Sequence, residues 1–336
     1  MEAERVLVLD ANRNCSLSFA RSLHGRGMKV TAGGQSRVSR AGLSRATHRT
    51  FVYPDPIQQT TRFVDHLVDF LDRTDHAAVI PMTDPTTSIL SKHRDEIEGT
   101  GTVPGVEGWE TFVAANDKAK LAELTEGLSV PVPDTYVPDS FDDVVDRAED
   151  LSYPVLIKPR LTSVAEEGGG YREIRISSTN YADSPSELVS TYRSFLKAHG
   201  DSRQQPPIVQ EVVPGTTMAT AALADGGEVL AYFQEERLRT YPVDSGVDFP
   251  WLHYRQLRGL TPTHDGNYRT DFKQRRLFYR DINWLRTKLA RGEYRAVYPF
   301  LAAFVDSHEE VLRPDDPLPL VGVAWDTAKQ LAETYL

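Results

Sequence analysis

Four short segments in the middle of the chain carry residue types that could hold a polyphosphate. Lys118 lies in the first turn of an expected helix, and Lys158 ends a wholly apolar strand. The glycines Gly168–Gly170 follow in a loop, and Gln210–Glu211 end another strand. An ammonium at the end of an apolar strand is costly to bury without a counter-charge, which a triphosphate supplies. The four segments together predict a nucleotide site.

Each group suits one part of such a ligand. A lysine ammonium gains about 4 kcal/mol from a phosphate oxygen roughly 4 Å away at an effective dielectric constant of about 20. Glycine N–H groups can approach phosphates because no Cβ interferes, and the strand with Glu211 exposes main-chain groups that can bind an adenine edge. Taken singly, a lysine at a strand end is also typical of an ordinary surface residue. The run Gly168–Gly170 is also typical of a turn that binds nothing. Their order and spacing favour the nucleotide.

The N-terminal part of the chain alternates strands with helices, which predicts a parallel sheet. The expected strands are Arg5–Asp10, Met28–Thr31, Thr50–Tyr53 and Ala77–Pro81, and the expected helices are Ser16–Arg26 and Thr61–Leu71. Ligands of such sheets bind at the carboxyl ends of the strands, where Asp10, Asn12 and Thr83–Asp84 lie. No G-x-G-x-x-G follows the first strand, so a dinucleotide site is not expected.

A second unit begins near Asn116, where Asn116 or Asp117 caps a helix that runs to Gly127. Further helices are expected at Asp139–Asp150 and Ser184–His199. Apolar runs bounded by turns predict strands at Tyr153–Lys158, Pro207–Val212, Thr217–Leu223 and Glu228–Gln234. From Val247 onward the pattern is helical and rich in aromatic residues.

Several strings in this order resemble one family. The strings NDKAKLAEL, VPVPDTY, YPVLIKPR, IVQEVVPGT and QEERLRTYP are similar to the ATP-grasp superfamily, in particular its carbamoyl-phosphate-synthase-like branch. VIPMTDPTTSILSKHRDEI resembles the end of the domain that precedes ATP-grasp in such proteins, and the resemblance returns at GVDFPWLHYRQLRG. It implies an α/β fold, with a parallel-sheet pre-ATP-grasp domain at 1–112. It further implies a small ATP-grasp lobe at 113–200, a shortened C-terminal lobe at 201–246 and a C-terminal helical segment at 247–336.

Family members use ATP to phosphorylate a carboxylate, and an amine then attacks the acyl phosphate. The resemblance implies that Lys118 and Lys158 contact the α- and β-phosphates. It also implies that the loop with Glu167, Gly168, Gly169 and Gly170 closes over the triphosphate. Gln210, Glu211 and Val213 would border the adenine, and Arg237 would lie near the transferring phosphoryl group. A surface ion pair with Glu235 or Glu236 is an equally good interpretation of Arg237.

The sequence departs from the family where magnesium ligands should follow. Family members carry a Glu and a Glu-x-Asn-Pro-Arg-like string after the strand of Arg237, and these carboxylates hold Mg²⁺. Here Val243 passes directly to Asp244 and to a segment that resembles what normally follows. The metal-binding hairpin is therefore interpreted as deleted, no metal ligand is assigned, and the shortened sheet gains an exposed edge. The aromatic-rich tail could cover that edge or form an ordinary helical layer. The nearest carboxylates in sequence are Glu235, Glu236, Asp244 and Asp248.

Three hypotheses follow from this pattern. The chain is an ATP-dependent carboxylate–amine ligase, a catalytically inactive nucleotide-binding or regulatory protein, or the impaired product of a damaged gene. The ligase would act on a small-molecule carboxylate and amine and would need ATP and Mg²⁺. A homodimer is left open.

The amino-acid composition limits the possible partners and the cellular environment of the protein. The net charge of −10 argues against a nucleic-acid partner. Nine of the 38 basic residues are lysines, and this acidic, lysine-poor composition suggests adaptation to high salt. No apolar run is long enough to cross a membrane. The acidic start and the single Cys15 predict a cytoplasmic protein in which Cys15 has a structural role rather than that of a catalytic thiol.

Overall fold

The computed structural model describes residues 3–126, 128–166, 170–174, 176–199, 206–216, 218–236, 248–262, 274–275, 282–306, 308–309 and 311–335. The chain divides into two compact units. Unit 1 comprises Met1–Asp55, Arg62–Val106 and Thr216–Leu336, and unit 2 comprises Pro56–Thr61 and Glu107–Gly215. The four-part division expected from the sequence stays a prediction.

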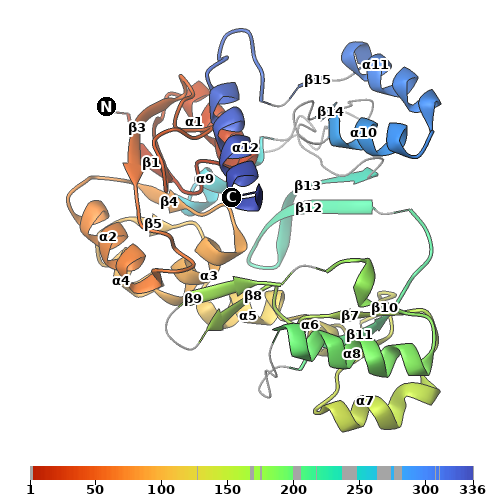
Figure 1. The fold of residues 1–336 in the computed structure, drawn as a ribbon. Helices are drawn as coiled ribbons and strands as arrows, with labels where there is room; N and C mark the ends of the chain where they lie inside the picture. The colour runs from red at the N-terminus through yellow and green to blue at the C-terminus, as the bar shows by residue number, and fades with distance from the viewer. Residues whose placement is uncertain are drawn as a thin grey trace. The chain divides into compact units, whose positions relative to one another are not determined.

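Unit 1 contains a five-stranded parallel sheet, as predicted (Figure 1). Its strand order is β3-β2-β1-β4-β5. The strands are β1 (Arg5–Val8), β2 (Lys29–Gly34), β3 (Thr47–Val52), β4 (Ala78–Ile80) and β5 (Val103–Pro104). The central strand β1 is a run of aliphatic side chains because helices cover both faces of a parallel sheet. Val6 and Val8 pack with Ala20 of helix α1 (Asn14–Gly25) and Tyr254 of helix α9 (Phe249–Leu257) on one face.

The helices that accompany this sheet are α1 (Asn14–Gly25), α2 (Thr60–Asp72), α3 (Asp84–Lys92) and α4 (Arg94–Glu98). Each longer helix buries one apolar stripe: Leu17, Ala20 and Leu23 of α1, and Phe63, Val64, Leu67 and Leu71 of α2. This spacing of three and four residues is typical of a helix with one face on a core. None of the described helices combines the length and the apolar character that crossing a lipid bilayer requires.

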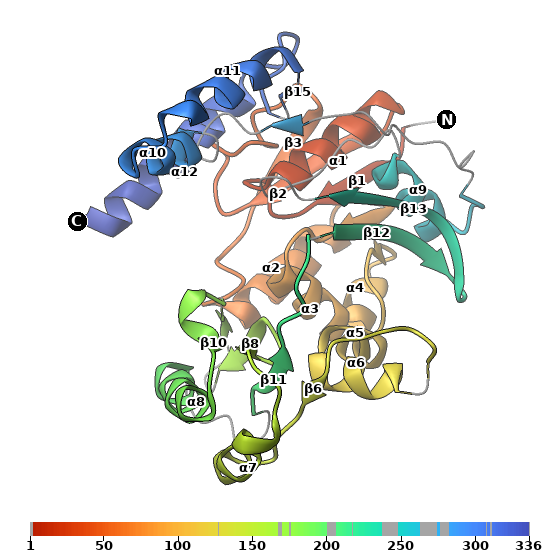
Figure 2. The same ribbon diagram turned by 90° about the vertical axis from the view of Figure 1, so that its right-hand side faces the viewer.

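Strands β12 (Met218–Asp225) and β13 (Glu228–Glu236) pair antiparallel as a hairpin in unit 1 (Figure 2). Ala231 and Phe233 of β13 pack against Leu252 of helix α9 (Phe249–Leu257). Among the described residues, no third strand pairs with this hairpin. Helix α9 therefore lies on one face of the hairpin, as an ordinary helical layer does.

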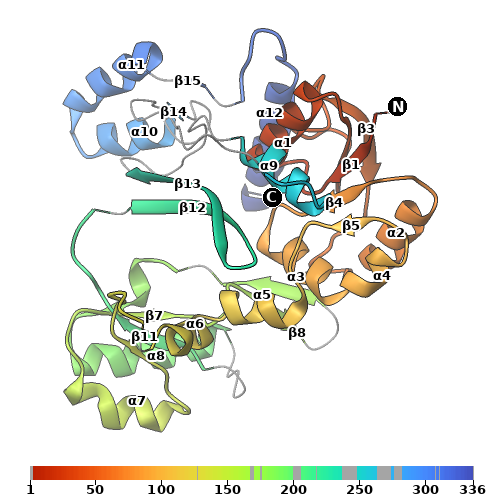
Figure 3. The same cartoon turned by 180° about the vertical axis from the view of Figure 1, so that it is seen from behind.

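The last part of unit 1 returns to the parallel sheet. Its elements are β14 (Gln274–Arg275), α10 (Ile282–Ala290), a 3-10 turn at Tyr294–Ala296, α11 (Val297–Asp306), β15 (His308–Glu309) and α12 (Pro319–Tyr335). Helices α12 and α1 lie side by side (Figure 3). Val323 of α12 is buried with Leu17 of α1, and Val311 joins the same cluster. Ala11, which follows β1, and Ala32 of β2 complete this packing. The segment 311–335 thus covers residues at the carboxyl ends of the first two strands.

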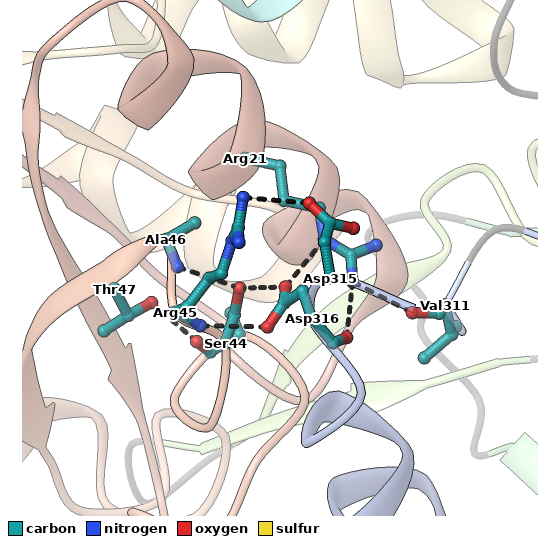
Figure 4. Close-up of polar contacts among 9 residues, drawn as sticks. Arg21, Ser44, Arg45, Ala46, Thr47, Val311, Asp315 and Asp316 are labelled. Carbon is teal, nitrogen blue, oxygen red and sulfur yellow. Dashed lines mark hydrogen bonds and ion pairs between the residues drawn. The ribbon is translucent and has the colours of Figure 1, made fainter. Parts of the chain in front are cut away.

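Asp316 fixes this segment to the N-terminal part of unit 1 (Figure 4). Its carboxylate accepts hydrogen bonds from Arg21 Nε at 3.0 Å, from the backbone N–H of Arg45 at 3.0 Å and from Ser44 Oγ at 2.5 Å. The side chains of Asp316 and Arg21 are only 4% and 9% exposed. Burial alone would raise the pKa of the Asp316 carboxyl, but the bonds from Ser44, Arg45 and Arg21 outweigh it and hold that pKa below its usual range.

Gly322 allows α12 to lie directly on the loop after β2. A Cβ at Gly322 would lie 2.7 Å from the backbone nitrogen of Arg40 and 2.7 Å from the carbonyl carbon of Ser39. Neither backbone atom can move aside without shifting the loop. We therefore expect Gly322→Ala to lower the free energy of unfolding by about 1–3 kcal/mol, measured by chemical denaturation.

Gly25→Ala is the matched control, because a Cβ at Gly25 meets no atom within 4 Å. Alanine is favoured over glycine in a helix, so this variant should be as stable as the wild type or slightly more stable. Equal stability of the two variants would contradict the close packing of α12.

Unit 2 is built on a four-stranded antiparallel sheet of order β10-β7-β11-β6. These strands are β6 (Thr135–Tyr136), β7 (Val155–Lys158), β10 (Tyr181–Ala182) and β11 (Ile208–Glu211). A separate antiparallel pair consists of β8 (Ser163–Glu166) and β9 (Gly170–Glu173). The helices are α5 (Trp109–Asn116), α6 (Lys118–Thr125), α7 (Phe141–Arg147) and α8 (Pro185–His199), with 3-10 turns at Ala148–Asp150 and Ser178–Asn180.

One face of the unit 2 sheet forms the core. Val155, Ile157 and Val209 pack against Leu188 and Tyr192 of α8, which runs along these strands in Figure 1. Because side chains alternate along a strand, Lys158 and Gln210 belong to the opposite face. Together the two units confirm the predicted α/β class, in which a parallel sheet is followed by antiparallel ones.

Candidate functional site

Two lysines from different elements of unit 2 lie at the positions that the sequence predicts. Helix α6 begins at Lys118, and strand β7 ends at Lys158. The backbone N–H and the Nζ of Lys118 both donate to the carbonyl oxygen of Arg160, at 3.1 and 3.3 Å. Arg160 is two residues beyond Lys158. The start of α6 is therefore bound to the segment that leaves β7.

Lys158 lies at one end of a short hydrogen-bonded chain. Its Nζ donates to Gln210 Oε1 at 2.6 Å, and Gln210 Nε2 donates to Thr135 Oγ1 at 2.8 Å. The Thr135 hydroxyl in turn donates to the carbonyl oxygen of Pro133 at 2.9 Å. Lys158 and Gln210 share a face because Ile208 is the register partner of Lys158. This series of hydrogen bonds fixes the Gln210 amide with its oxygen toward Lys158.

The Lys158 ammonium is half-buried and has a neutral partner. Burial lowers its pKa, because removing water disfavours the charged form. In the part of unit 2 that the structure describes, no carboxylate forms an ion pair with Lys158. Transfer of an ammonium out of water is unfavourable without a compensating charge. An anionic ligand at this face would supply that charge.

Asp117 and Arg160, which are close in sequence to the two lysines, form an ion pair. The sequence did not predict this pair. Arg160 Nε donates to Asp117 Oδ1 at 2.9 Å, and Arg160 Nη2 donates to Oδ2 at 2.7 Å. Asp117 Oδ1 also caps α6, since it accepts from the N–H groups of Ala119 at 3.0 Å and Lys120 at 3.4 Å. The expected helix cap was the only signal for Asp117. Its partner is 43 positions away, so the pair could not be identified from spacing.

This environment determines the charge of Asp117, whose side chain is 1% exposed. Burial alone would raise the pKa of its carboxyl, but the hydrogen bonds from Arg160 and Ala119 and the charge of Arg160 outweigh it. The pKa is therefore held below its usual range, and the pair stays ionised. Two parallel bonds from a planar guanidinium are among the stronger charge-assisted contacts in proteins.

The three residues expected near adenine, Gln210, Glu211 and Val213, differ in their contacts and exposure. Gln210 contacts Lys158, as described above. The N–H of Glu211 donates to the carbonyl oxygen of Asp134 at 2.9 Å, and the N–H of Val212 donates to that of Pro154 at 3.1 Å. The Val213 side chain is 58% exposed. Two backbone donors of this segment are thus engaged, and the roles of Glu211 and Val213 stay predictions.

Part of the expected site falls outside the described residues, namely Glu167, Gly168, Gly169, Arg237 and Asp244. Gly170 is the first residue of β9 and pairs with Glu166 of β8. From the sequence Gly170 is expected in a loop, whereas the structure places it in this strand. Glu235 and Glu236 end β13, and the structure does not describe their side chains.

Asp248, one of the four carboxylates nearest in sequence to the point where the metal-binding hairpin is interpreted as deleted, has a structural role. Its Oδ1 caps α9 by accepting from the N–H of Trp251 at 3.3 Å and also accepts from the Ser22 hydroxyl. Its Oδ2 pairs with Arg26 Nη2 at 3.2 Å. Within the described ranges, no three or more His, Cys, Asp or Glu side chains gather as metal ligands would.

Asp10, which the sequence placed at the ligand edge of the parallel sheet, holds strand ends together. It has a left-handed backbone with a φ of 56°. Its Oδ2 accepts from the Met82 N–H at 3.0 Å, Thr83 Oγ1 at 3.2 Å and Thr86 Oγ1 at 2.6 Å. Its own N–H donates to the Tyr53 hydroxyl at 3.0 Å. These bonds tie the end of β1 to the ends of β3 and β4, so Asp10 serves the sheet itself.

Comparison by sequence finds relatives of one kind. The carbamoyl phosphate synthase large chain of Pyrococcus furiosus is 28% identical over 140 residues, which are 41% of this chain and 12% of that protein. The large chain from Clostridium acetobutylicum is 20% identical over 208 residues, 60% of this chain and 18% of that protein. Each match therefore spans less than a fifth of the relative's length. No protein-family model matches the chain.

Comparison of structures gives more distant similarities. A crystal structure of an L-amino acid ligase from Bacillus licheniformis has a TM-score of 0.49 and 15% sequence identity. The match covers 69% of this chain and 50% of the ligase.

Proposed function

We propose that the chain is an ATP-grasp protein of the carboxylate–amine-ligase kind, because carbamoyl phosphate synthase large chains are among its relatives, and that its unit 2 binds ATP through Lys118 and Lys158. The half-buried ammonium of Lys158, which has Gln210 as a neutral partner, is the observation that carries this proposal. A phosphate oxygen beside it would replace lost hydration with a full counter-charge, and such charge-assisted bonds are worth more than neutral ones.

Lys118 supports the same site from the neighbouring helix. Its ammonium already contacts the main chain of Arg160, two residues after Lys158. The helix that begins at Lys118 is thus hydrogen-bonded to the segment that directly follows Lys158. Two ammonium groups suit the α- and β-phosphates of a nucleotide. The glycine segment Gly168–Gly170 would contribute backbone N–H groups to the phosphates.

Two activities are compatible with this site. In the first, the chain joins a small-molecule carboxylate to an amine through an acyl phosphate, and Arg237 stabilises the transferring phosphoryl group. In the second, the chain binds the nucleotide without turnover. The engagement of Asp248 with Ser22, Arg26 and Trp251 favours the second activity, because this carboxylate is already used to cap α9 and to pair with Arg26.

Calorimetry with ATP, first with Mg²⁺ and then with EDTA, tests the proposal. We expect ATP to bind in EDTA with an affinity within about tenfold of that in Mg²⁺, because ammonium groups supply the counter-charge. ADP release, assayed with a panel of carboxylates and amines, should stay at the background of protein-free samples. Absence of ATP binding in both buffers would overturn the proposed site. Strict dependence on Mg²⁺ together with ADP release would establish the ligase instead.

A further inference from the structure

We propose that Asp117 and Arg160 act as a clasp that positions Lys118 and Lys158 for the phosphates, while Arg160 itself does not bind them. This inference rests on the proposed nucleotide site. It concerns two residues whose hydrogen bonds and ion pair, among the described residues, lie within unit 2. The clasp is defined as the paired side chains of Asp117 and Arg160, with the carbonyl group of Arg160.

The clasp joins the two elements that carry the lysines. Asp117 directly precedes Lys118 and caps its helix, while Arg160 follows Lys158 with Pro159 between them. The side chain of Arg160 holds Asp117 by two bonds of 2.9 and 2.7 Å. Its carbonyl oxygen holds both the backbone and the ammonium of Lys118. Arg160 therefore fixes the start of α6 through its side chain and its main chain at once.

The charges explain why Arg160 positions rather than binds. Asp117 neutralises the guanidinium of Arg160 through a bidentate pair that is largely removed from water, with side chains 18% and 1% exposed. The same carboxylate also takes up donors of the first turn of α6, where an anion would otherwise be favoured. An approaching phosphate thus meets the two ammonium groups as its cationic partners. Leaving the pair would cost Arg160 both of its bonds to Asp117.

Two variants separate this role from direct binding. Asp117→Asn keeps the helix cap, because asparagine caps as well as aspartate does, but it removes the charge that holds Arg160. If Arg160 positions the lysines, Asp117→Asn lowers the affinity for ATP. If Arg160 were itself a phosphate ligand, Asp117→Asn would release the guanidinium and raise that affinity. Arg160→Gln removes the other half of the pair, and Arg160→Lys keeps a charge without the two parallel bonds.

The experiment is calorimetry of the full chain with AMP, ADP and ATP in EDTA. The wild type should bind more tightly as the phosphate chain lengthens. We expect Asp117→Asn and Arg160→Gln to weaken ATP binding roughly 10- to 100-fold, and AMP binding by a smaller factor, because AMP offers the lysines an α-phosphate but no β-phosphate. The double variant should be no weaker than the worse single variant, because the two residues act as one unit. Arg160→Lys should recover part of the loss.

Arg147→Gln is the matched control, since Arg147 pairs with Asp150 at 3.4 Å on the exposed surface of unit 2 and should leave all three affinities unchanged. Tighter ATP binding by Asp117→Asn, or wild-type ATP affinity in both single variants, would overturn the clasp. A wild type that binds none of the three nucleotides would overturn the proposed function itself. Thermal unfolding of each variant verifies that the chain is folded, and Asp117→Asn carries the test if Arg160→Gln does not fold.

Discussion

Lys158→Met should reduce the affinity for ATP by about 10- to 150-fold, the largest effect we expect from one side chain of the proposed site. Methionine keeps the length of the side chain but cannot neutralise a phosphate or donate to it. A charge-assisted hydrogen bond contributes about 1.5–3 kcal/mol, and about 3 kcal/mol corresponds to slightly more than 100-fold in Kd. Isothermal titration calorimetry with ATP measures the loss directly.

The stability of Lys158→Met and the pH dependence of its ATP binding distinguish loss of the ammonium from a general loss of structure. The variant removes a half-buried charge, so its free energy of unfolding should equal or exceed that of the wild type. The pKa of Lys158 is lowered, hence its ammonium is lost at a lower pH than that of an exposed lysine. Wild-type affinity should therefore fall as the pH rises through that pKa, and Lys158→Met should lack this step.

Lys197→Met is the matched control, because Lys197 is exposed near the end of α8. It should bind ATP like the wild type. ATP binding by Lys158→Met at wild-type strength would refute the assignment of Lys158 to the phosphates.

Asp316→Ala should be the most destabilising of the substitutions considered, with a cost of about 3–5 kcal/mol. The reason is that it leaves the guanidinium of Arg21 buried without its carboxylate, and breaking a buried pair from one side has a cost of this size. It also removes the acceptor for Ser44 and for the N–H of Arg45. Chemical denaturation of both variants and the wild type gives the difference.

Asp315→Ala is the control, since Asp315 is the residue directly before Asp316 and differs from it mainly in burial. Asp315 pairs with Arg45 at 2.8 Å, but both side chains are more than half exposed. Exposed pairs contribute at most about 1 kcal/mol. Similar losses in the two variants would contradict the structural role of Asp316.

The same pair gives a pH dependence with a definite sign. The pKa of Asp316 is lower in the folded chain than in the unfolded one. Its contribution is therefore complete above the unfolded pKa and is lost as the pH falls through the folded pKa. Asp316→Ala should lose less stability than the wild type over that acidic range.

The sequence correctly predicted the local structure around two residues of the candidate site. Lys118 at a helix start and Lys158 at a strand end follow from a cap and from an apolar run, and both positions are confirmed. The pairing of Asp117 with Arg160 and of Arg21 with Asp316 could not be read in this way. Each joins residues distant in sequence, the second pair by 295 positions, and no spacing rule links them.

Strand and helix ends show a second limit. The second strand was expected to end at Thr31, but β2 continues to Gly34. Glycines are weak strand formers, which hid this extension. The structure supplies the reason for one of them, because a Cβ at Gly33 would lie 2.9 Å from Leu9 and 3.2 Å from Tyr53. Helix α7 likewise begins at Phe141, not Asp139, because Ser140 accepts from the N–H of Asp143 and caps it.

The return of 311–335 to the start of the chain has a consequence for biosynthesis. A ribosome delivers β1, α1 and β2 long before it delivers Asp316 and α12, with the whole of unit 2 made in the interval. Until then Ala11, Leu17, Ala32 and Ala41 lack the cover that Val311 and Val323 later provide. Growing chains would thus display an unfinished apolar surface, the kind of surface that chaperones bind. This cluster is therefore completed only when α12 has been made.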